Sequence, residues 1–308
     1  MSIDLTGKVV AITGGSRGIG LATAAAFRHR GAHVAIGARD LAHARVVAQR
    51  VGARAYALDV TEPASMRAFF EDVEHDHGPI DIFVNNAGEM LVGRFETETE
   101  AATHHQLGVN LLGTLHGMKT ALPAMRDRGR GHVINMVSAV GMVGLPGCAT
   151  YSAAKHGVTG LSEAVRGELR GSGVHLSIVL PIPAATKLTS GVGKGRFVPL
   201  LTSVDIAERV VSTARHPRRY SVYVPGWTNP VTRLMFLVPQ NVRDVLGRFL
   251  KADQLLHTTD TAARRPYEER VFGPSAASTD NRVVSLHAPA NGSAPEPPEN
   301  ASENGTGA

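Results

Sequence analysis

Tyr151 and Lys155 are the two residues whose types and spacing most clearly suggest catalysis. They stand at positions i and i+4 of Thr150–Gly171, a segment of helical period, so their side chains share one helix face. A tyrosine with a pKa of about 10 is a poor base at neutral pH. A positive charge about 4 Å away, at an effective dielectric constant of about 20, favours the phenolate by about 4 kcal/mol. We therefore expect Lys155 to lower the pKa of Tyr151 towards the range in which a general acid or base is effective.

Two upstream polar residues are candidates to assist this pair. Ser138 ends a predicted strand, and ligands of parallel sheets bind beyond the carboxyl ends of the strands. Its hydroxyl can hydrogen-bond a carbonyl or alcohol oxygen. Asn110 stands inside a predicted helix, although asparagine is a mediocre helix former, and a water-mediated link towards Lys155 would explain it. Local backbone capping is the alternative for both residues.

A glycine-rich segment, Thr13–Gly20, follows the first predicted strand and opens the first predicted helix. Glycines let the chain turn tightly and let a phosphate approach the backbone. The amides around Gly18–Gly20 carry the positive end of the helix dipole, which favours an anion. The segment therefore predicts a dinucleotide-binding loop.

The end of the second predicted strand distinguishes the two nicotinamide cofactors. An acidic residue there would bind the ribose 2′-hydroxyl of NAD and repel a 2′-phosphate. The chain has Arg39 at this point and no carboxylate before Asp40, while Arg17 can approach from the glycine loop. A guanidinium pairs well with phosphate, so we expect NADP(H) rather than NAD(H). The alternative is that Arg39 points to solvent or stacks on adenine.

Two further strand ends could line the same cofactor. Asp59 and Val60 close the third predicted strand, where the carboxylate could hold the adenine amino group. Asn85–Gly88 closes the fourth and offers small residues where a cofactor backbone could pass. For either segment an ordinary strand-end turn is the alternative.

Short β-branched apolar runs alternate with longer segments of helical period, which predicts βαβ units. Right-handed crossovers then give a doubly wound, Rossmann-type α/β sheet with helices on both faces, in one domain of residues 1–226. The predicted strands are Lys8–Thr13, His33–Gly37, Arg54–Leu58, Ile80–Asn85, His132–Ser138, Val174–Leu180 and Tyr220–Val224. The predicted helices are Ile19–Arg30, Leu41–Arg50, Glu62–His77, Glu98–Arg128, Thr150–Gly171 and Ser203–His216.

Beyond the domain, residues 227–273 have helical character, with an apolar segment 231–238 that Pro239 ends and a second helix at 241–250. This extension could cover the domain or a neighbouring subunit. It could instead lie on a membrane through residues 231–250, with its basic face at anionic headgroups. Residues 274–308 are rich in Ala, Ser, Pro, Asn and Gly, and we expect them to be disordered.

The composition of the 308-residue chain excludes several classes of protein. With 43% hydrophobic and 19% charged residues it can form a large core, and it has no apolar run long enough to span a membrane. The start lacks signal-peptide features and Cys148 is the only cysteine, so we expect a cytoplasmic protein. The net charge of +5 comes without a basic run, which argues against nucleic acid. The histidines lack the spacing of metal ligands, so we expect no metal site.

Taken together, these motifs resemble the short-chain dehydrogenase/reductase family over about residues 4–226. The resemblance implies a seven-stranded parallel sheet, a homo-oligomer built through 98–128 and 150–171, and hydride transfer between the nicotinamide and a substrate carbon. Tyr151 would exchange the substrate proton, Ser138 would hold the substrate oxygen, Lys155 would bind the nicotinamide ribose and Asn110 would position a water. The candidate cofactor-binding residues are Gly14, Ser16, Arg17, Gly18, Ile19, Gly20, Arg39, Asp59, Val60, Asn86, Ala87, Gly88, Tyr151, Lys155 and Thr186.

One motif departs from the family. After the sixth strand the family carries Pro-Gly-x-x-x-Thr, whereas this chain has Pro181, Ile182 and then Thr186 in the threonine position. Ile182 cannot adopt a positive φ cheaply. Either the turn is built differently here or the nicotinamide is placed differently.

The substrate is indicated only by apolar residues. Val140, Met142, Val143 and Leu145 lie between Ser138 and Tyr151 and could line a pocket, while residues 187–201 would form a mobile lid. We expect a lipophilic secondary alcohol or ketone, such as a lipid-like or steroid-like compound. A non-catalytic nucleotide-binding scaffold of the same fold is the alternative. A methyltransferase or sugar-nucleotide epimerase is disfavoured, because the lid region is too short for a nucleotide-sugar subdomain.

Overall fold

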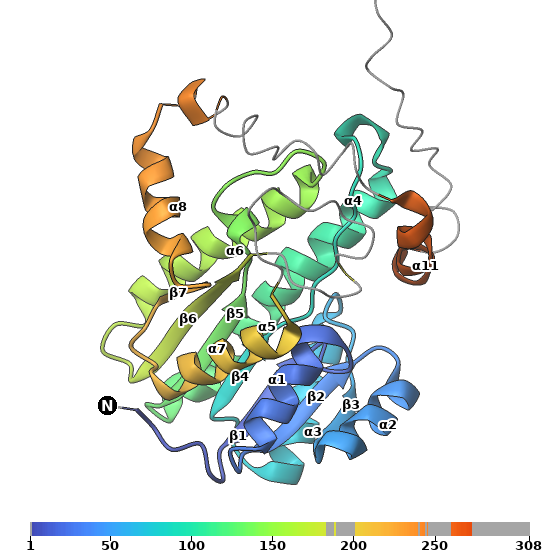
Figure 1. The fold of residues 1–308 in the computed structure, drawn as a ribbon. Helices are drawn as coiled ribbons and strands as arrows, with labels where there is room; N and C mark the ends of the chain where they lie inside the picture. Colours follow the sequence, from blue (N-terminus) through green and yellow to red (C-terminus); the bar gives the residue numbers. More distant parts are fainter. Residues whose placement is uncertain are drawn as a thin grey trace, which may run out of the picture.

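The computed structural model describes residues 2–182, 188, 201–239, 241–243, 245 and 260–272. Its centre is a seven-stranded parallel sheet in the order β3-β2-β1-β4-β5-β6-β7, with helices on both faces (Figure 1). This confirms the doubly wound, Rossmann-type sheet. The strands are β1 Val9–Thr13, β2 His33–Ala38, β3 Arg54–Ala57, β4 Ile82–Asn85, β5 Gly131–Met136, β6 Val174–Pro181 and β7 Ser221–Val224.

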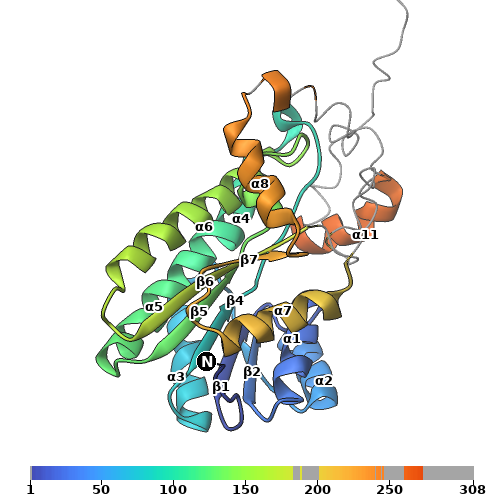
Figure 2. The same cartoon turned by 60° about the vertical axis from the view of Figure 1, so that its left-hand side comes forward.

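Two helical layers cover the sheet, as the edge-on view shows (Figure 2). Central strands are buried on both faces, and their alternate residues enter two separate apolar clusters. Ala11 and Phe83 belong to the cluster with α3, α5 and α6, whereas Ile12 and Ile82 belong to the cluster with α1, α2 and α7. The helices on the first face are α3 Pro63–His77, α5 Gly113–Asp127 and α6 Ala149–Glu168, and those on the second are α1 Gly18–Arg28, α2 Leu41–Val51 and α7 Ser203–Arg215.

The strand order places a crevice at the carboxyl ends of β1 and β4. β1 has β2 as its neighbour on one side and β4 on the other, and the connections that leave β1 and β4 lead to opposite halves of the sheet. The loops at the ends of these two strands therefore diverge. Ligands of doubly wound sheets bind at such a switch point. Thr13 ends β1 and Asn85 ends β4, so the glycine loop and the Asn85–Gly88 segment both start at this crevice.

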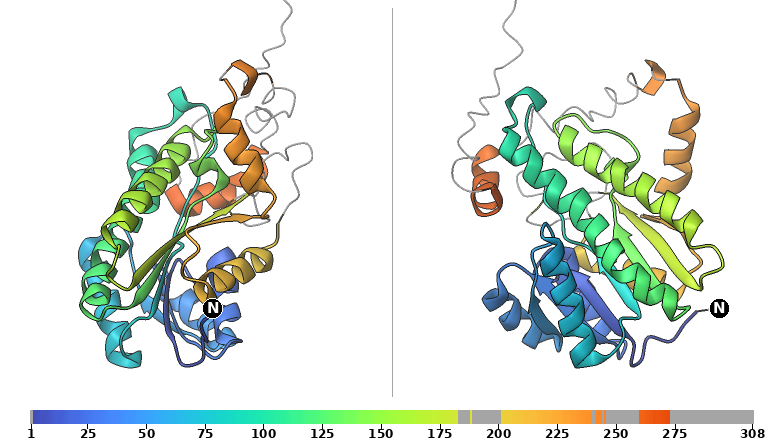
Figure 3. Two further views of the ribbon diagram at one scale, coloured as in Figure 1. Left: turned by 90° about the vertical axis from the view of Figure 1, so that its left-hand side faces the viewer. Right: turned by 180° about the vertical axis from the view of Figure 1, so that it is seen from behind.

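The predicted helix over residues 98–128 is interrupted in the structure. α4 covers Glu100–Leu107, a π-helical turn covers Gly108–Leu112, and α5 follows directly. Seen from behind, α4, α5 and α6 lie over the strands and cover this face of the sheet (Figure 3). Single π turns inside α-helices are frequent at functional sites, and this one contains Asn110.

The extension contains two helices within the described residues, α8 Thr228–Leu237 and α11 Thr261–Phe272. α8 confirms the helix expected before Pro239, and several apolar side chains on and beside it are exposed. Trp227, Val231, Leu234 and Leu237 are 53%, 51%, 62% and 81% exposed. No helix among the described residues is long and apolar enough to cross a bilayer.

Several expectations lie outside the described residues. These are Thr186, the predicted lid except Leu188 and Leu201, most of the second extension helix, and the predicted disordered tail 274–308.

Candidate active site

The glycine loop forms a cradle that only glycine permits. Gly14 has φ +64°, and a Cβ there would lie 2.9 Å from Ala87 Cα. A Cβ on Gly20 would collide with the Gly14 carbonyl oxygen and the Asn86 amide. At the start of α1, Arg17 is the N-cap residue and makes no side-chain hydrogen bond to the first turn. The loop thus turns tightly in front of helix amides, as a phosphate-binding loop requires.

Asn86 fixes this loop against the end of β4. Its Nδ2 donates to the carbonyl oxygens of Thr13 and Gly14, at 2.9 and 3.2 Å. The Thr13 hydroxyl oxygen in turn accepts from the backbone amides of Asn86 and Ala87, both at 3.0 Å. The two segments that the sequence placed at separate strand ends therefore form one rigid wall.

A cavity of about 570 Å³ opens over this wall, within the size range of cofactor sites. All the predicted cofactor residues within the described part of the chain line it except Tyr151 and Lys155, which lie deeper. The lining contributed by predicted residues is Gly14, Ser16, Arg17, Gly18, Ile19, Gly20, Arg39, Asp59, Val60, Asn86, Ala87 and Gly88. The cradle, the helix terminus and the cavity together fit a dinucleotide.

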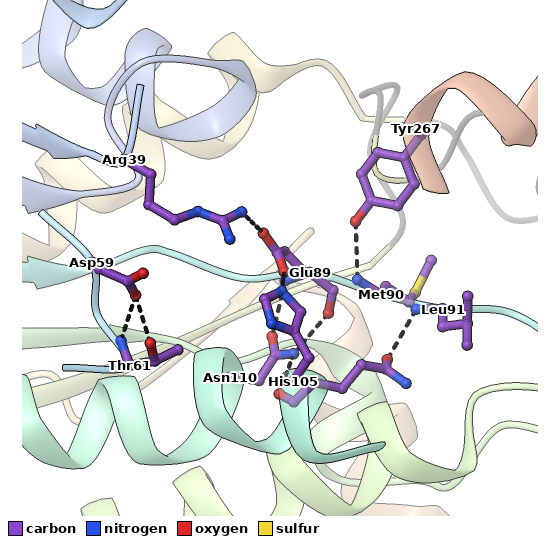
Figure 4. A network of polar contacts seen from close by, with 10 residues as sticks. Arg39, Asp59, Thr61, Glu89, Met90, Leu91, His105, Asn110 and Tyr267 are labelled. Carbon is purple, nitrogen blue, oxygen red and sulfur yellow. Dashed lines mark hydrogen bonds and ion pairs between the residues drawn. The ribbon is translucent and has the colours of Figure 1, made fainter. Parts of the chain in front are cut away.

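Asp59 keeps its carboxylate ionised at the edge of this cavity. Burial raises its pKa, but hydrogen bonds from the Thr61 hydroxyl and amide outweigh that effect, and the net pKa is below the usual value. Both Thr61 bonds end on Oδ1, at 2.7 and 2.9 Å (Figure 4). A fixed carboxylate is suited to accept from an amino group such as that of adenine.

A carboxylate from another segment approaches Arg39, which the end of the second strand alone did not predict. Arg39 Nη2 lies 2.5 Å from Oε1 of Glu89, and His105 Nε2 lies 2.6 Å from the other Glu89 oxygen (Figure 4). Glu89 directly follows the Asn85–Gly88 segment and its side chain is 12% exposed. Arg17 is likewise near an acid, with Nη2 3.6 Å from Asp40. Both cations line the cavity as predicted, but each faces a carboxylate.

Tyr151 and Lys155 are both buried in the first half of α6, at 7% and 3% exposure. Lys155 Nζ lies 5.7 Å from the centre of the Tyr151 ring and donates to the Met136 carbonyl at 3.1 Å. Burial lowers the pKa of Lys155 to about 8. The pair thus shares one face of the helix, as its spacing predicts.

The expected direction of the Tyr151 shift is wrong for the protein alone. Burial raises the pKa of the phenol above its usual value, and the Cys148 thiol beside it acts the same way. A hydrogen bond with Ser138 acts in the opposite direction but is outweighed. Desolvation has the largest effect on this pKa, because the Tyr151 ring is nearly inaccessible to solvent and the Lys155 ammonium lies no nearer than the face of the ring. The resting phenol is therefore protonated.

Asn110 organises the loop after β4 instead of capping only its own helix. Its Nδ2 donates to the carbonyl oxygens of Glu89 and Gln106, at 2.7 and 2.9 Å, and its Oδ1 accepts from the Glu89 amide at 3.2 Å (Figure 4). A Cβ on Gly88 would lie 3.1 Å from Asn110 Oδ1 and 3.6 Å from Lys155 Nζ. Asn110, Gly88 and Lys155 thus meet at one place, at the inner end of the cavity.

Ser138 lies at the end of the sheet beside Tyr151, with an apolar cluster next to it. Its Oγ accepts from the Val140 amide at 3.3 Å and caps the short 3-10 helix Ala139–Gly141. Tyr151 packs in a small cluster with Met90, Val92 and Cys148. Val140, Leu145 and Leu188 pack against that cluster. Val140 and Leu145 are two of the four residues predicted to line a substrate pocket.

Ile182 shows how the turn after β6 begins in this chain. Its amide donates to the Val224 carbonyl at 3.0 Å, and its side chain is 9% exposed. The β6–β7 pairing thus continues through the position where the family has glycine. The rest of the turn, residues 183–187, lies outside the described residues, so the choice between a differently built turn and a differently placed nicotinamide stays open.

α11 is the part of the site that the sequence did not predict. Tyr267, Arg270 and Val271 line the same cavity as the glycine loop, and Arg264 is buried at 1% exposure beneath them. In the sequence, Arg264 and Arg265 are visible only as two adjacent cations. The visible signal was the i, i+4 pairing of Arg264 with Glu268 and of Arg265 with Glu269, which predicts a helix but not its docking place.

Within the described residues no group of three or more His, Cys, Asp or Glu side chains is arranged to hold a metal ion.

Comparisons with known proteins agree with the geometry of the cleft. A family model described as short chain dehydrogenase matches residues 8–196. The 3-alpha-(or 20-beta)-hydroxysteroid dehydrogenase of Mycobacterium bovis is 33% identical over 227 residues, 72% of this chain and 87% of that relative.

Two solved structures share the fold. A metagenomic short-chain oxidoreductase in complex with NADP is 31% identical, with a TM-score of 0.62, covering 72% of this chain and 97% of its own. A short-chain dehydrogenase/reductase from Burkholderia phymatum in complex with NAD has a TM-score of 0.69 and covers 75% of this chain and 94% of its own. At 21% identity the latter indicates the fold alone.

Proposed function

Because this chain belongs to the short-chain dehydrogenase family, we propose that it transfers hydride between NADP(H) and a lipophilic secondary alcohol or ketone. The chain is an oxidoreductase of alcohol and carbonyl groups. The observation that carries the proposal is the buried Tyr151–Lys155 pair, with Lys155 close to Gly88 at the inner end of a cavity lined by the glycine cradle, Arg17 and Arg39.

The chain's own residues support a proton transfer at Tyr151. When bound, the nicotinamide supplies or accepts the hydride. In the reductive direction, Tyr151 donates its phenolic proton to the substrate oxygen, and its raised pKa keeps that proton in place beforehand. Ser138 hydrogen-bonds the same oxygen, and Lys155 stabilises the phenolate that forms.

Lys155 has the charge that this role requires. With a pKa of about 8, its ammonium is largely protonated at pH 7 and faces the Tyr151 ring. Gly88 leaves room beside Nζ for a cofactor hydroxyl, since a Cβ there would lie 3.6 Å away. Asn110 holds the backbone that carries Gly88 and so positions the cofactor side of the pair.

NADP(H) is supported by the guanidinium groups of Arg17 and Arg39, which line the cavity. Arg39 is 47% exposed and Arg17 41% exposed on their side chains, so both can reach a 2′-phosphate. The relative solved with NADP supports the same choice. Glu89 competes for Arg39, so a 2′-phosphate must share or displace that ion pair.

A lipophilic substrate is supported by the cluster around Tyr151. Met90, Val92, Cys148, Val140, Leu145 and Leu188 surround the ring with apolar atoms. A polar sugar would lose hydration there without hydrogen-bond partners. The hydroxysteroid dehydrogenase relative is consistent with this class.

The proposal is tested by NADPH consumption with a panel of carbonyl compounds. We expect turnover of bicyclic and steroidal ketones and none with Tyr151→Phe. Turnover of charged sugars or sugar nucleotides only would contradict the lipophilic class, and turnover with NADH alone would contradict the cofactor choice.

We also propose a homo-oligomer through α4, α5 and α6. Leu112, between α4 and α5, is 46% exposed and Phe95 is 69% exposed, which supports a covered apolar face in solution. Sedimentation equilibrium is expected to give a multiple of the chain mass that Leu112→Asp reduces. A monomer mass for the unmodified protein would contradict this assembly.

A further inference from the structure

α11 lies beside the crevice at the carboxyl ends of the strands. In the sequence, a segment outside the described residues separates this helix from the domain. Three of its residues, Tyr267, Arg270 and Val271, line the cavity opposite the glycine loop. The helix is drawn beside α4 in Figure 1 and above α7 and α1 in Figure 2. α11 therefore forms one wall of the cavity that the glycine loop also lines.

A buried arginine attaches this wall to the domain. Arg264 Nη1 donates to the Leu188 carbonyl at 3.0 Å, Nη2 donates to the Met90 carbonyl, and Nε donates to Glu268 at 2.7 Å. A guanidinium at 1% exposure needs all of these partners, because burying an unpaired charge is costly. The contact is specific and fixes the rotation of α11 about its axis.

Tyr267 makes a second contact between α11 and the domain. Its hydroxyl oxygen accepts from the Met90 amide at 3.0 Å (Figure 4). α11 thus binds both the backbone amide and the backbone carbonyl of Met90, which belong to consecutive peptide groups. Met90 follows Gly88 and Glu89, so α11 is joined to the very loop that carries predicted cofactor residues and the partner of Arg39.

Arg270 is placed by this attachment on the cavity side of α11. Its Cζ lies 5.4 Å from the centre of the Tyr267 ring, a cation–π contact. Among the described residues no carboxylate lies within ion-pair distance of Arg270, whereas Arg17 faces Asp40 and Arg39 faces Glu89. Arg270 is therefore the cavity's uncompensated cation within that part of the chain.

We propose that α11 completes the cofactor site and that Arg270 on it binds a phosphate of the dinucleotide. The inference rests on the proposed NADP(H) function. The described cavity lining holds three guanidinium groups, of Arg17, Arg39 and Arg270, against three carboxylates, of Asp40, Asp59 and Glu89. A ligand with several phosphate charges gains most from the cation that no carboxylate compensates.

Arg270→Ala tests the proposal, with Arg265→Ala as the matched control. Arg265 stands on the same helix, its side chain is 70% exposed, it pairs with Glu269 at 2.7 Å, and it does not line the cavity. The dissociation constants of NADPH and NADH are measured by fluorescence titration at low and high salt, and thermal unfolding shows that both variants fold.

We expect Arg270→Ala to weaken NADPH binding about tenfold at low salt and less at high salt, with Arg265→Ala within about twofold of the unmodified protein. An equal loss for NADH assigns Arg270 to the diphosphate, and a loss for NADPH alone assigns it to the 2′-phosphate. Either result supports the proposal.

Unchanged binding in Arg270→Ala, in a protein that binds NADPH, would overturn the role of Arg270 and leave the proposed function intact. Failure of the unmodified protein to bind either cofactor would overturn both. An equal loss in Arg265→Ala would also overturn the proposal, because the effect would then come from the charge of the helix as a whole.

Discussion

Arg39 Nη2 lies 2.5 Å from Glu89 Oε1, so a residue from the end of β2 is bound to one from the loop after β4 across the cofactor cavity. His105 binds the other Glu89 oxygen and holds the carboxylate in place. Glu89 thus takes one side of the guanidinium that a 2′-phosphate would use. We therefore expect the choice of cofactor to depend on this competition as well as on Arg39 itself.

Glu89→Gln should tighten NADPH binding. The amide keeps the size of the side chain but removes the negative charge that competes for Arg39. We expect a several-fold lower dissociation constant for NADPH and a smaller change for NADH, by fluorescence titration. Glu96→Gln is the control, since Glu96 pairs with Arg94 away from the cavity. Equal improvement for both cofactors would show that Glu89 does not act on the 2′-phosphate.

Tyr151→Phe should remove turnover and spare cofactor binding. The substitution keeps the buried ring and deletes only the hydroxyl that holds the proton. General acid catalysis contributes about 10²–10⁴-fold, so kcat should fall by at least that range while NADPH affinity stays within about twofold. A residual kcat near that of the unmodified protein would assign the proton to another group.

Lys155 should make stability depend on pH in the alkaline range. Its pKa falls from 10.5 to about 8 on folding, because burial disfavours the ammonium. Between these values the unfolded chain binds more protons than the folded one, so the free energy of unfolding rises with pH. Burial raises the pKa of the Cys148 thiol from 9.0 to about 11, which acts in the opposite direction above pH 9. We therefore expect the free energy of unfolding of the protein to gain on that of Lys155→Met between about pH 8 and pH 10, in urea titrations of both. The opposite trend in this difference would mean that the folded lysine keeps its proton more tightly.

Ile182→Gly restores the family's glycine and should destabilise this protein. The side chain is 9% exposed and extends the β6–β7 pairing, so the change removes buried apolar surface and adds chain entropy. We expect a loss of about 3 kcal/mol in the free energy of unfolding, against about 1 kcal/mol for Ile182→Val. A stability gain in Ile182→Gly would indicate backbone strain at this residue.

The placement of Tyr151 and Lys155 and the position of the glycine loop could be predicted because their signals are local. Tyr151 and Lys155 share one helix turn, and Thr13–Gly20 and Asn85–Gly88 mark strand ends that a parallel sheet brings together. The sheet itself followed from alternating apolar runs. The interruption of the helix at Asn110 was not predictable, because no pattern of composition distinguishes a π turn.

The contacts that could not be predicted from the sequence join residues far apart in the chain. Glu89 is 50 positions from Arg39, and Arg264 is 174 positions from Met90. Their meeting depends on how loops leave the sheet. Likewise, the pKa of Tyr151 depends on how deeply the ring is buried, which spacing alone does not give.

NADPH and NADH titration of the unmodified protein and Arg39→Ala, side by side, tests the central claim most directly. We expect tight NADPH binding that falls to the level of NADH in the variant, with NADH binding little changed. Equal affinity for both cofactors, unaffected by the substitution, would contradict the assignment of Arg39 to the 2′-phosphate. Binding of neither cofactor would contradict the proposed oxidoreductase site as a whole.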